Sequence, residues 1–360
     1  MTLKKILILA ALTSCTLSAN AQSKFGLMVS SNSFSNALPI KELVEDEWKS
    51  GPEKDSDLAY TTNVAGFEYQ YNNWYFSATK RLDLIADTNP DTVFALYQDK
   101  LDLGFSADKT YQLDINLKQI EASQLSAGYQ YQIDNLTLLT LVSYIQFETM
   151  RESNLAGEVS INDEQAFLGK VSFTEYYTDK NLLKRPYKGW NQQGKGASLS
   201  FKLNYQKDQF NFQLNVWDLF SHLKIDETGY SGGTFDTQSR YRQELGLNSI
   251  GPLFTGWESE LDAKFKLNRR LEAGLNYQTD NLNNIELNAD FEHFANHNRI
   301  WLGATKLINE VKYQLMFDPI NLTPQLGLKS KYVDFSLALD SLNINKAKQI
   351  KLNLNLFYTW

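Results

Sequence analysis

Apolar and polar residues alternate with a period of two over most of the chain from about residue 61 to the end. In residues 197–206, for example, Leu199, Phe201 and Leu203 occupy one face of an extended segment, and serine, lysine and asparagine occupy the other. The alternation resumes after polar turns such as Lys207-Asp208. Because a β-strand points successive side chains to opposite faces, the pattern predicts many strands, each with one apolar and one wet face.

A soluble β-sandwich would alternate in the same way, but three features favour a barrel in a membrane. Ionised groups recur on the polar faces, as in residues 286–292, and an export signal precedes the strands. Aromatic residues also gather near the predicted strand ends: Tyr69, Tyr71, Trp74, Tyr129, Tyr131, Tyr277, Phe291 and Trp301. A closed antiparallel barrel is the sheet that can sit in lipid, since closure leaves no unpaired edge. The predicted fold class is therefore all-β, an antiparallel transmembrane β-barrel.

The last predicted strand has an unbroken apolar face that ends on the final residue. Its members are Ile350, Leu352, Leu354, Leu356, Tyr358 and Trp360. This ending resembles the signal by which Gram-negative outer-membrane barrels are recognised for assembly. The resemblance implies the cell outer membrane of a Gram-negative bacterium as the location. It also implies the barrel-assembly machinery, outer-membrane lipid and lipopolysaccharide as partners.

Residues 1–21 have the composition of a signal peptide, with a basic start, a short apolar core and the cleavage motif Ala19-Asn20-Ala21. A second interpretation is a lipoprotein box in which Cys15 is lipidated. Cleavage after Ala21 would remove this cysteine, the single one in the chain, and with it disulfides and thiolate chemistry. The full chain has a net charge of −7, which argues against nucleic acid as a partner.

The length of the chain limits the number of strands. Residues 61–360, at roughly 20 to 22 residues per strand and connection, predict about 14 strands, with 12 and 16 as neighbouring counts. A barrel of this size is expected to have a lumen too wide for wall side chains alone to fill. Residues 22–60 are the candidate plug, because Ile40, Leu43 and Trp48 fall at helical spacing. The alternative for this segment is a charged, exposed loop.

One further resemblance rests on about thirty residues. A glycine-led strand, Gly194-Lys195-Gly196-Ala197-Ser198-Leu199-Ser200, is followed by Val216-Trp217-Asp218-Leu219-Phe220-Ser221. This pair of segments resembles a pattern in the long-chain fatty-acid transporter superfamily. The resemblance implies a 14-stranded barrel with an N-terminal plug and a path for hydrophobic compounds. The family's plug residues have no match in this chain, so its activity does not carry over.

The candidate chemistry is sparse. The three histidines are His222, His293 and His297, and the last two stand four apart in a segment that the flanking strands predict to be a polar loop tip. No serine follows a histidine at a distance of two, so the dyad of barrel lipid hydrolases is missing from the sequence. We therefore predict no enzyme activity, no catalytic, cofactor-binding or metal-binding residue, and no cofactor.

The predicted function is a channel or transporter that passes small solutes, with hydrophobic or amphiphilic solutes favoured. The alternative is a closed barrel that serves as a scaffold or anchor for envelope proteins, and an outer-membrane enzyme comes third. A long loop is expected at 178–196, and either a long loop or a protruding hairpin is expected at 218–256. The charges expected to face the lumen are of both signs, so no strong ion selectivity is predicted. They are Lys202, Lys264, Lys266, Glu286, Asp290, Lys312 and Lys351.

Overall fold

The computed structural model describes residues 23–105, 109–161, 167–179, 193–242, 248–279 and 285–360. The predicted signal peptide, with Ala19 and Ala21, lies outside these residues. The strands are β1 (Ser23–Ser35), β2 (Leu58–Tyr71), β3 (Trp74–Thr88), β4 (Thr110–Ile133), β5 (Leu136–Ile161), β6 (Phe167–Tyr177), β7 (Gly194–Lys207), β8 (Phe210–Arg242), β9 (Asn248–Phe265), β10 (Arg270–Gln278), β11 (Ile285–Phe294), β12 (His297–Ile308), β13 (Val311–Asp318), β14 (Thr323–Lys329), β15 (Val333–Leu339) and β16 (Gln349–Thr359). The helices are α2 (Ile40–Glu45) and α3 (Pro90–Lys100).

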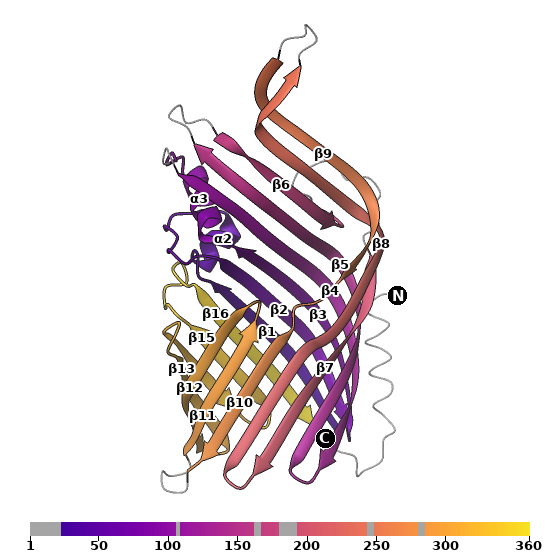
Figure 1. Cartoon of the computed structure of the whole chain (residues 1–360). Helices are drawn as coiled ribbons and strands as arrows, with labels where there is room; N and C mark the ends of the chain where they lie inside the picture. The colour runs from indigo at the N-terminus through magenta and orange to yellow at the C-terminus, as the bar shows by residue number, and fades with distance from the viewer. Residues whose placement is uncertain (1–22, 106–108, 162–166, 180–192, 243–247, 280–284) are drawn as a thin grey trace.

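Fourteen of these strands close into one antiparallel barrel, which confirms the predicted fold class and strand number. The ring runs from β1 to β5, then through β7, β8 and β10 to β16, and returns to β1 (Figure 1). The first and last strands pair from Lys24 with Thr359 to Phe34 with Gln349. The hydroxyl of Ser30 donates to the Asn353 amide oxygen across this seam at 2.7 Å. No sheet edge is therefore left open around the ring.

The two ends of the barrel differ in their connections. At one end, where β1 begins and β16 ends, two-residue turns join β2 to β3, β4 to β5, β7 to β8 and β12 to β13, and we call it the short-turn end. Asn72, Asp134 and Asp208 have positive φ in these turns, a conformation that asparagine and aspartate tolerate well. Outer-membrane barrels have short periplasmic turns and longer extracellular loops. By this rule the opposite end, which we call the long-loop end, is expected to face the outside.

A tall extension rises from the wall at the long-loop end. The first part of β5 pairs with β7 and its second part pairs with β6, so β6 and β7 lie end to end beside β5. In the same way β8 pairs with β10 in its first part and with β9 beyond it. We call the resulting sheet the apron; it comprises residues 110–120, 150–161, 167–177, 228–242 and 248–262 (Figure 1). The stretch 218–256, expected to be a long loop or a protruding hairpin, belongs to the paired strands β8 and β9, whereas most of the expected loop 178–196 lies outside the described residues.

The candidate plug segment, residues 22–60, contributes a strand to the barrel wall, and the expected start of the barrel at residue 61 was wrong. Residues 23–35 form the wall strand β1, and the wall resumes at Leu58 rather than at residue 61. The sequence signal of β1 is weak because its second half is rich in serine. The helical stripe exists only as α2, which starts after Pro39 and lies at the long-loop end (Figure 1).

The connection between β1 and β2 packs over the rim of the barrel. Leu38 is fully buried and contacts Val93 of α3 in a small apolar cluster. The carboxylate of Glu42 accepts hydrogen bonds from the backbone N–H groups of Lys49 and Ser50, at 2.7 and 2.9 Å, and from the Ser50 hydroxyl at 2.7 Å. This connection is thus a folded cap over one side of the mouth.

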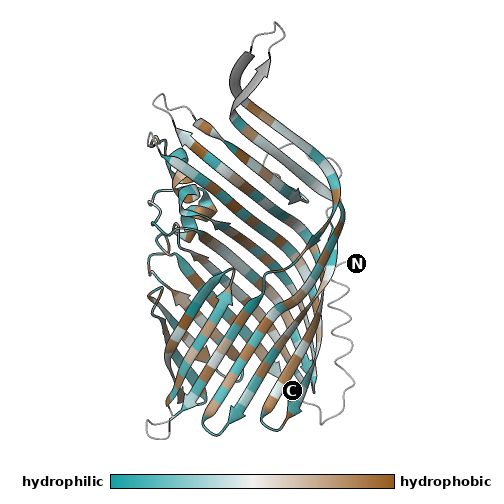
Figure 2. Ribbon diagram, viewed as in Figure 1, coloured by the Kyte–Doolittle hydropathy of each residue, from teal (hydrophilic) through white to brown (hydrophobic). Residues whose placement is uncertain are grey.

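The outer face of the ring has the apolar surface that lipid requires. Bands of apolar and polar residues alternate along each strand (Figure 2). Leu302, Leu315 and Leu326 on neighbouring strands are 50 to 60% exposed. Part of the predicted aromatic girdle lies at the short-turn end, where the rings of Trp74 and Tyr129 stand 5.1 Å apart. Among the described helices, none has the length and apolar character to cross a membrane.

Candidate functional site

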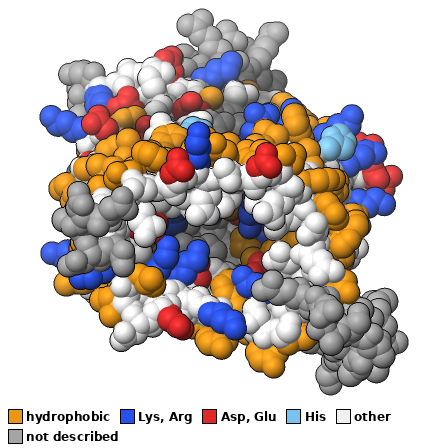
Figure 3. Space-filling model, turned by 90° about the horizontal axis from the view of Figure 1, so that it is seen from below, with side chains coloured by type: hydrophobic (Ala, Val, Ile, Leu, Met, Phe, Trp, Pro, Cys, Tyr) orange, Lys and Arg blue, Asp and Glu red, His pale blue; other side chains and the backbone are white. Residues whose placement is uncertain are grey.

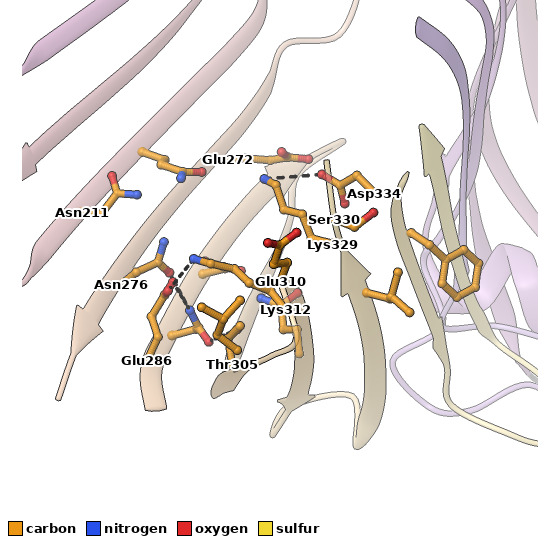
Figure 4. A pocket seen from close by; sticks show the side chains of 17 residues that line it. Asn211, Glu272, Asn276, Glu286, Thr305, Glu310, Lys312, Lys329, Ser330 and Asp334 are labelled. Atoms are coloured by element: carbon orange, nitrogen blue, oxygen red, sulfur yellow. Dashed lines mark hydrogen bonds and ion pairs between the residues drawn. The ribbon is translucent and has the colours of Figure 1, made fainter. Parts of the chain in front are cut away.

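The interior of the barrel opens toward the short-turn end as a polar vestibule. Seen from below, the molecule is hollowed at its centre, with basic side chains around the hollow (Figure 3). Two adjoining cavities of about 610 and 570 Å³ make up this space and share Glu272, Lys329 and Asp334 in their walls. Facing side chains form ion pairs across the strands, such as Lys312 with Glu286 at 2.9 Å (Figure 4). The vestibule therefore suits water and polar groups.

Above the vestibule a layer of charged side chains crosses the lumen, and Glu292 of β11 is its centre. The Glu292 carboxylate lies 2.8 Å from the Lys351 ammonium, 2.8 Å from Arg299 and 3.2 Å from Arg270. It also accepts a hydrogen bond from the Asn32 side chain of β1 at 2.9 Å. Strands β12 to β16 stand between β11 and β1 in the ring. The contacts of Glu292 with Asn32 and with Lys351 of β16 therefore bridge the lumen, whereas Arg299 and Arg270 lie on the two strands next to β11.

A second bridge completes the charged layer. The guanidinium of Arg81 on β3 contacts Asp83 at 2.6 Å and Asp218 of β8 at 2.5 Å, although β4, β5 and β7 separate the two strands. Both carboxylates are buried, at 8 and 3% exposure. The layer balances its charges, with four cations against four anions: Arg81, Arg270, Arg299, Lys351, Asp83, Asp218, Glu272 and Glu292. Each buried ion thus has a partner.

An apolar layer lies above the charged layer, toward the outside. On one side it is a cluster of ten buried residues from β4, β5, β8, β9 and the segment after β9: Ile120, Ala122, Ile145, Phe147, Met150, Leu223, Ile225, Ala263, Phe265 and Leu267. On the other side it consists of Phe34, Leu58, Tyr60, Ile85, Phe294 and Ala295. Apolar wall side chains therefore occupy two sides of the lumen at this level.

The tip of the β11–β12 hairpin explains how a barrel of this size is filled. His297 stacks on Phe34 of β1, with ring centroids 3.9 Å apart, and Phe294 meets the ring of Tyr60 edge-on at 5.1 Å. The tip of the hairpin formed by β11 and β12 thus contacts strands β1 and β2 across the lumen. The prediction of a polar loop tip at His293 and His297 was wrong for His297, which faces an apolar cluster. His293 is half-buried and hydrogen-bonded to Asn298.

Several buried polar atoms around the charged layer have no hydrogen-bond partner among the described residues. They include the Tyr60 hydroxyl, Nε of Arg270, Nη1 of Arg299 and Nε1 of Trp301. A small cavity of about 120 Å³ lies beside Trp301 and Glu292. Because buried donors rarely stay unpaired, this space suits water or the oxygen atoms of a polar head group.

One face of β9 carries an apolar stripe from the apron into the lumen. The apolar residues of this face are Leu253, Trp257, Leu261, Ala263 and Phe265, and Thr255 and Ser259 stand between them on the same face. Trp257 is 52% exposed and Leu261 is 40% exposed, whereas Phe265 is buried in the apolar layer at 5%. A Cβ on Gly232 would lie 2.7 Å from the Trp257 ring, so the indole rests on the bare backbone of β8. Beside the stripe, Tyr176 contacts Phe265, with ring centroids 5.9 Å apart.

Five of the seven charged residues that were predicted to face the lumen do so. Lys202, Glu286, Asp290, Lys312 and Lys351 line the interior cavities. Lys264 and Lys266 instead point outward, because their neighbours Ala263, Phe265 and Leu267 belong to the interior apolar layer. Trp301, predicted for the aromatic girdle, is buried inside at 2% exposure. The alternation predicted these strands correctly, but the face of each strand that was expected to point outward points into the lumen.

The six residues of the C-terminal face lie on β16 and at the end of the chain, and β16 pairs with both β15 and β1. The rings of Trp360 and Tyr69 are 6.3 Å apart at the short-turn end. The role of this face in assembly remains a prediction. Among the described residues, no group of three or more histidine, cysteine, aspartate or glutamate side chains is arranged to hold a metal ion.

Comparison with models of protein families gives no match, and comparison with curated protein sequences gives none either. Among solved structures, the chain is similar to the toluene transporter TodX of P. putida, with 12% identity over 95% of this chain and 90% of that chain and a TM-score of 0.41. It is also similar to the monoaromatic hydrocarbon channel CymD, with 9% identity over 98% and 91% and a TM-score of 0.26. The outer-membrane protease OmpT from Escherichia coli gives 10% identity over 96% and 100% and a TM-score of 0.25.

Proposed function

We propose that the protein is an outer-membrane channel that captures small amphiphilic solutes from outside and is held shut by its own interior. The observation that carries this proposal is the apolar stripe of β9, which is exposed at Trp257 and Leu261 and buried at Phe265. A stripe exposed to water costs free energy unless something apolar covers it. Its continuity with the interior apolar layer gives a captured solute a path into the barrel.

The layers below explain the preference for an amphiphile. The apolar layer suits a hydrocarbon part, and the unpaired donors of the charged layer beneath it suit a polar head. The vestibule then leads to the periplasm. Passage requires the β11–β12 tip to separate from β1 and β2, because the contact between His297 and Phe34 closes the lumen.

Capture is tested with 1-N-phenylnaphthylamine, a hydrophobic amine whose fluorescence rises in an apolar site. In the variant Trp257→Ser with Leu261→Ser, roughly 50 Å² of lost apolar contact at about 25 cal/mol per Å² weakens binding about tenfold. The matched control is Phe254→Ser, which removes an aromatic ring of 40% exposure that packs against Phe173 and Gly233 on the opposite face of the apron. Equal binding by the two variants would contradict capture on the inner stripe.

Closure is tested by single-channel conductance of the chain from Gln22 in a planar bilayer. We expect the wild-type barrel to be silent for most of the recording. The variant Phe294→Gly with His297→Gly removes both rings from the far wall and is expected to give discrete openings. A wild-type barrel that conducts steadily would refute the closed interior.

The closed interior also supports a second function, a scaffold that anchors envelope proteins. In that case the hairpin-tip variant conducts no better than wild type, and the probe binds wild type no better than the Trp257 and Leu261 variant. The two tests together therefore separate the channel from the scaffold.

A further inference from the structure

Three lysines stand side by side on the outer surface of the barrel wall. Lys195 of β7 pairs in register with Lys224 of β8, and Lys224 pairs in register with Lys264 of β9. All three side chains are exposed. Directly paired residues of antiparallel strands have Cα atoms about 5 Å apart, so the row places three ammonium groups across roughly 10 Å. His222 and Lys266, two residues away on the side toward the short-turn end, are exposed as well.

The row lies at the upper border of the apolar band. Below His222 and Lys266 the outward residues are apolar, and Phe220, Tyr144 and Val142 are 63, 49 and 57% exposed. Above it the outward residues include the carboxylates of Asp226 and Asp262, at 61 and 60% exposure. Since the long-loop end faces outward, this border coincides with the head groups of the outer leaflet.

Like charges placed directly opposite each other destabilise a sheet. Lys224 is paired with Asp226 and lies 3.5 Å from Asp262. Among the described residues, neither Lys195 nor Lys264 has an acidic partner. A row with this unbalanced charge is stabilised by an external anion at the same height, and at a membrane border that anion belongs to a lipid.

We propose that Lys195, Lys224 and Lys264 form a binding site for a lipid head group that carries more than one phosphate. The width of the row suits two phosphates on one head group better than the single phosphate of an ordinary phospholipid. The proposal rests on the membrane orientation used for the proposed function, but it does not depend on solute passage.

The test is native mass spectrometry of the folded chain in detergent, titrated with diphosphoryl lipid A, with monophosphoryl lipid A, and with phosphatidylglycerol. We expect the wild type to bind diphosphoryl lipid A most tightly. The triple variant Lys195→Gln, Lys224→Gln, Lys264→Gln is expected to bind it about 100-fold more weakly, since each lysine near an anionic surface contributes roughly fivefold. The triple arginine variant at the same positions keeps the charge and should retain binding.

The matched control replaces three exposed lysines near the short-turn end by glutamine: Lys207, Lys306 and Lys331. It should bind diphosphoryl lipid A as the wild type does. Equal loss in both triple variants, or equal affinity of the wild type for diphosphoryl lipid A and phosphatidylglycerol, would overturn the proposal. Heat-modifiable migration on gels confirms that each variant is folded. If the barrel binds the hydrophobic probe but the triple glutamine variant binds diphosphoryl lipid A as tightly as wild type, the lipid site is refuted and the channel is not. If the triple glutamine variant loses lipid A binding but the barrel does not bind the probe, the channel is refuted and the lipid site is not.

Discussion

Replacing Glu292 by glutamine should have a larger effect on stability than any other single change in the charged layer. Its carboxylate faces Lys351, Arg299 and Arg270 at 2.8 to 3.2 Å, and its own exposure is 3%. Glutamine preserves the size of the side chain and the hydrogen bond with Asn32. It removes the charge that three cations share.

Removing one partner from a buried ion pair costs about 3 to 5 kcal/mol, because the remaining charge is left in a poorly solvated place. Glutamine still accepts hydrogen bonds, so we expect the lower end, about 3 kcal/mol, or a change of roughly 150-fold in the folding equilibrium. The layer then holds four cations and three anions. Openings of this variant should therefore favour anions.

The assay is urea unfolding in detergent micelles, followed by far-UV circular dichroism and by heat-modifiable migration. The control is Glu286→Gln, which breaks the ion pair with Lys312, a side chain that is 46% exposed. Such exposed pairs contribute about 0 to 1 kcal/mol. If the two variants lose the same stability, the charged layer is not a closed, poorly solvated unit, and the explanation of the shut lumen fails.

Three other predictions test separate parts of the molecule. Gly194→Val should prevent folding of the wall at the start of β7, because a Cβ there would lie 1.9 Å from the Phe147 ring. The control is Gly51→Val, where the atom nearest to the added Cβ is 3.8 Å away, and this variant should migrate on gels as folded wild type does. Burial opposes ionisation of Glu42, but hydrogen bonds from two backbone N–H groups and a serine hydroxyl outweigh it and hold its pKa below the ordinary 4.5. The carboxylate thus stabilises its loop above pH 4.5 and loses this effect as pH falls further. The protection of residues 40–50 against hydrogen exchange, taken relative to the intrinsic exchange rate at each pH, should therefore fall in acid in wild type but not in Glu42→Gln. Deletion of residues 358–360 should cause periplasmic accumulation and degradation, and normal outer-membrane levels would contradict the predicted assembly signal.

The strands of this protein could be predicted from its sequence because alternation is a local property. Residues 197–206 and 350–360 show it without interruption, and both form strands of the wall. The expected 14 strands followed from length alone. The first strand was missed because Ser31, Ser33 and Ser35 blur its apolar face. Helix α3 was missed, although Asn89 caps it by accepting a hydrogen bond from Thr92 N–H and Pro90 follows at its first position.

The interior could not be predicted in the same way. Alternation tells which residues share a face, but it does not tell which face is inside. Ala263 and Phe265 look like lipid-facing residues in the sequence, and only the closed ring shows that they face the lumen. Glu292 and Asn32 are 260 residues apart, and nothing local in the chain indicates their contact. The layers are therefore a property of the assembled barrel.

The seam between β1 and β16 has a consequence for how the molecule folds. Its hydrogen bond between Ser30 and Asn353 joins residues 323 positions apart, so almost the whole chain must be made before this contact exists. Contacts of such long sequence separation form slowly, because the entropy of the open chain is lost before the contact repays it. The bridges of the lumen depend on the same closure. An unfinished barrel would keep an open seam and a wet, unformed interior at the same time, so that closing one strand pair completes both the wall and the core.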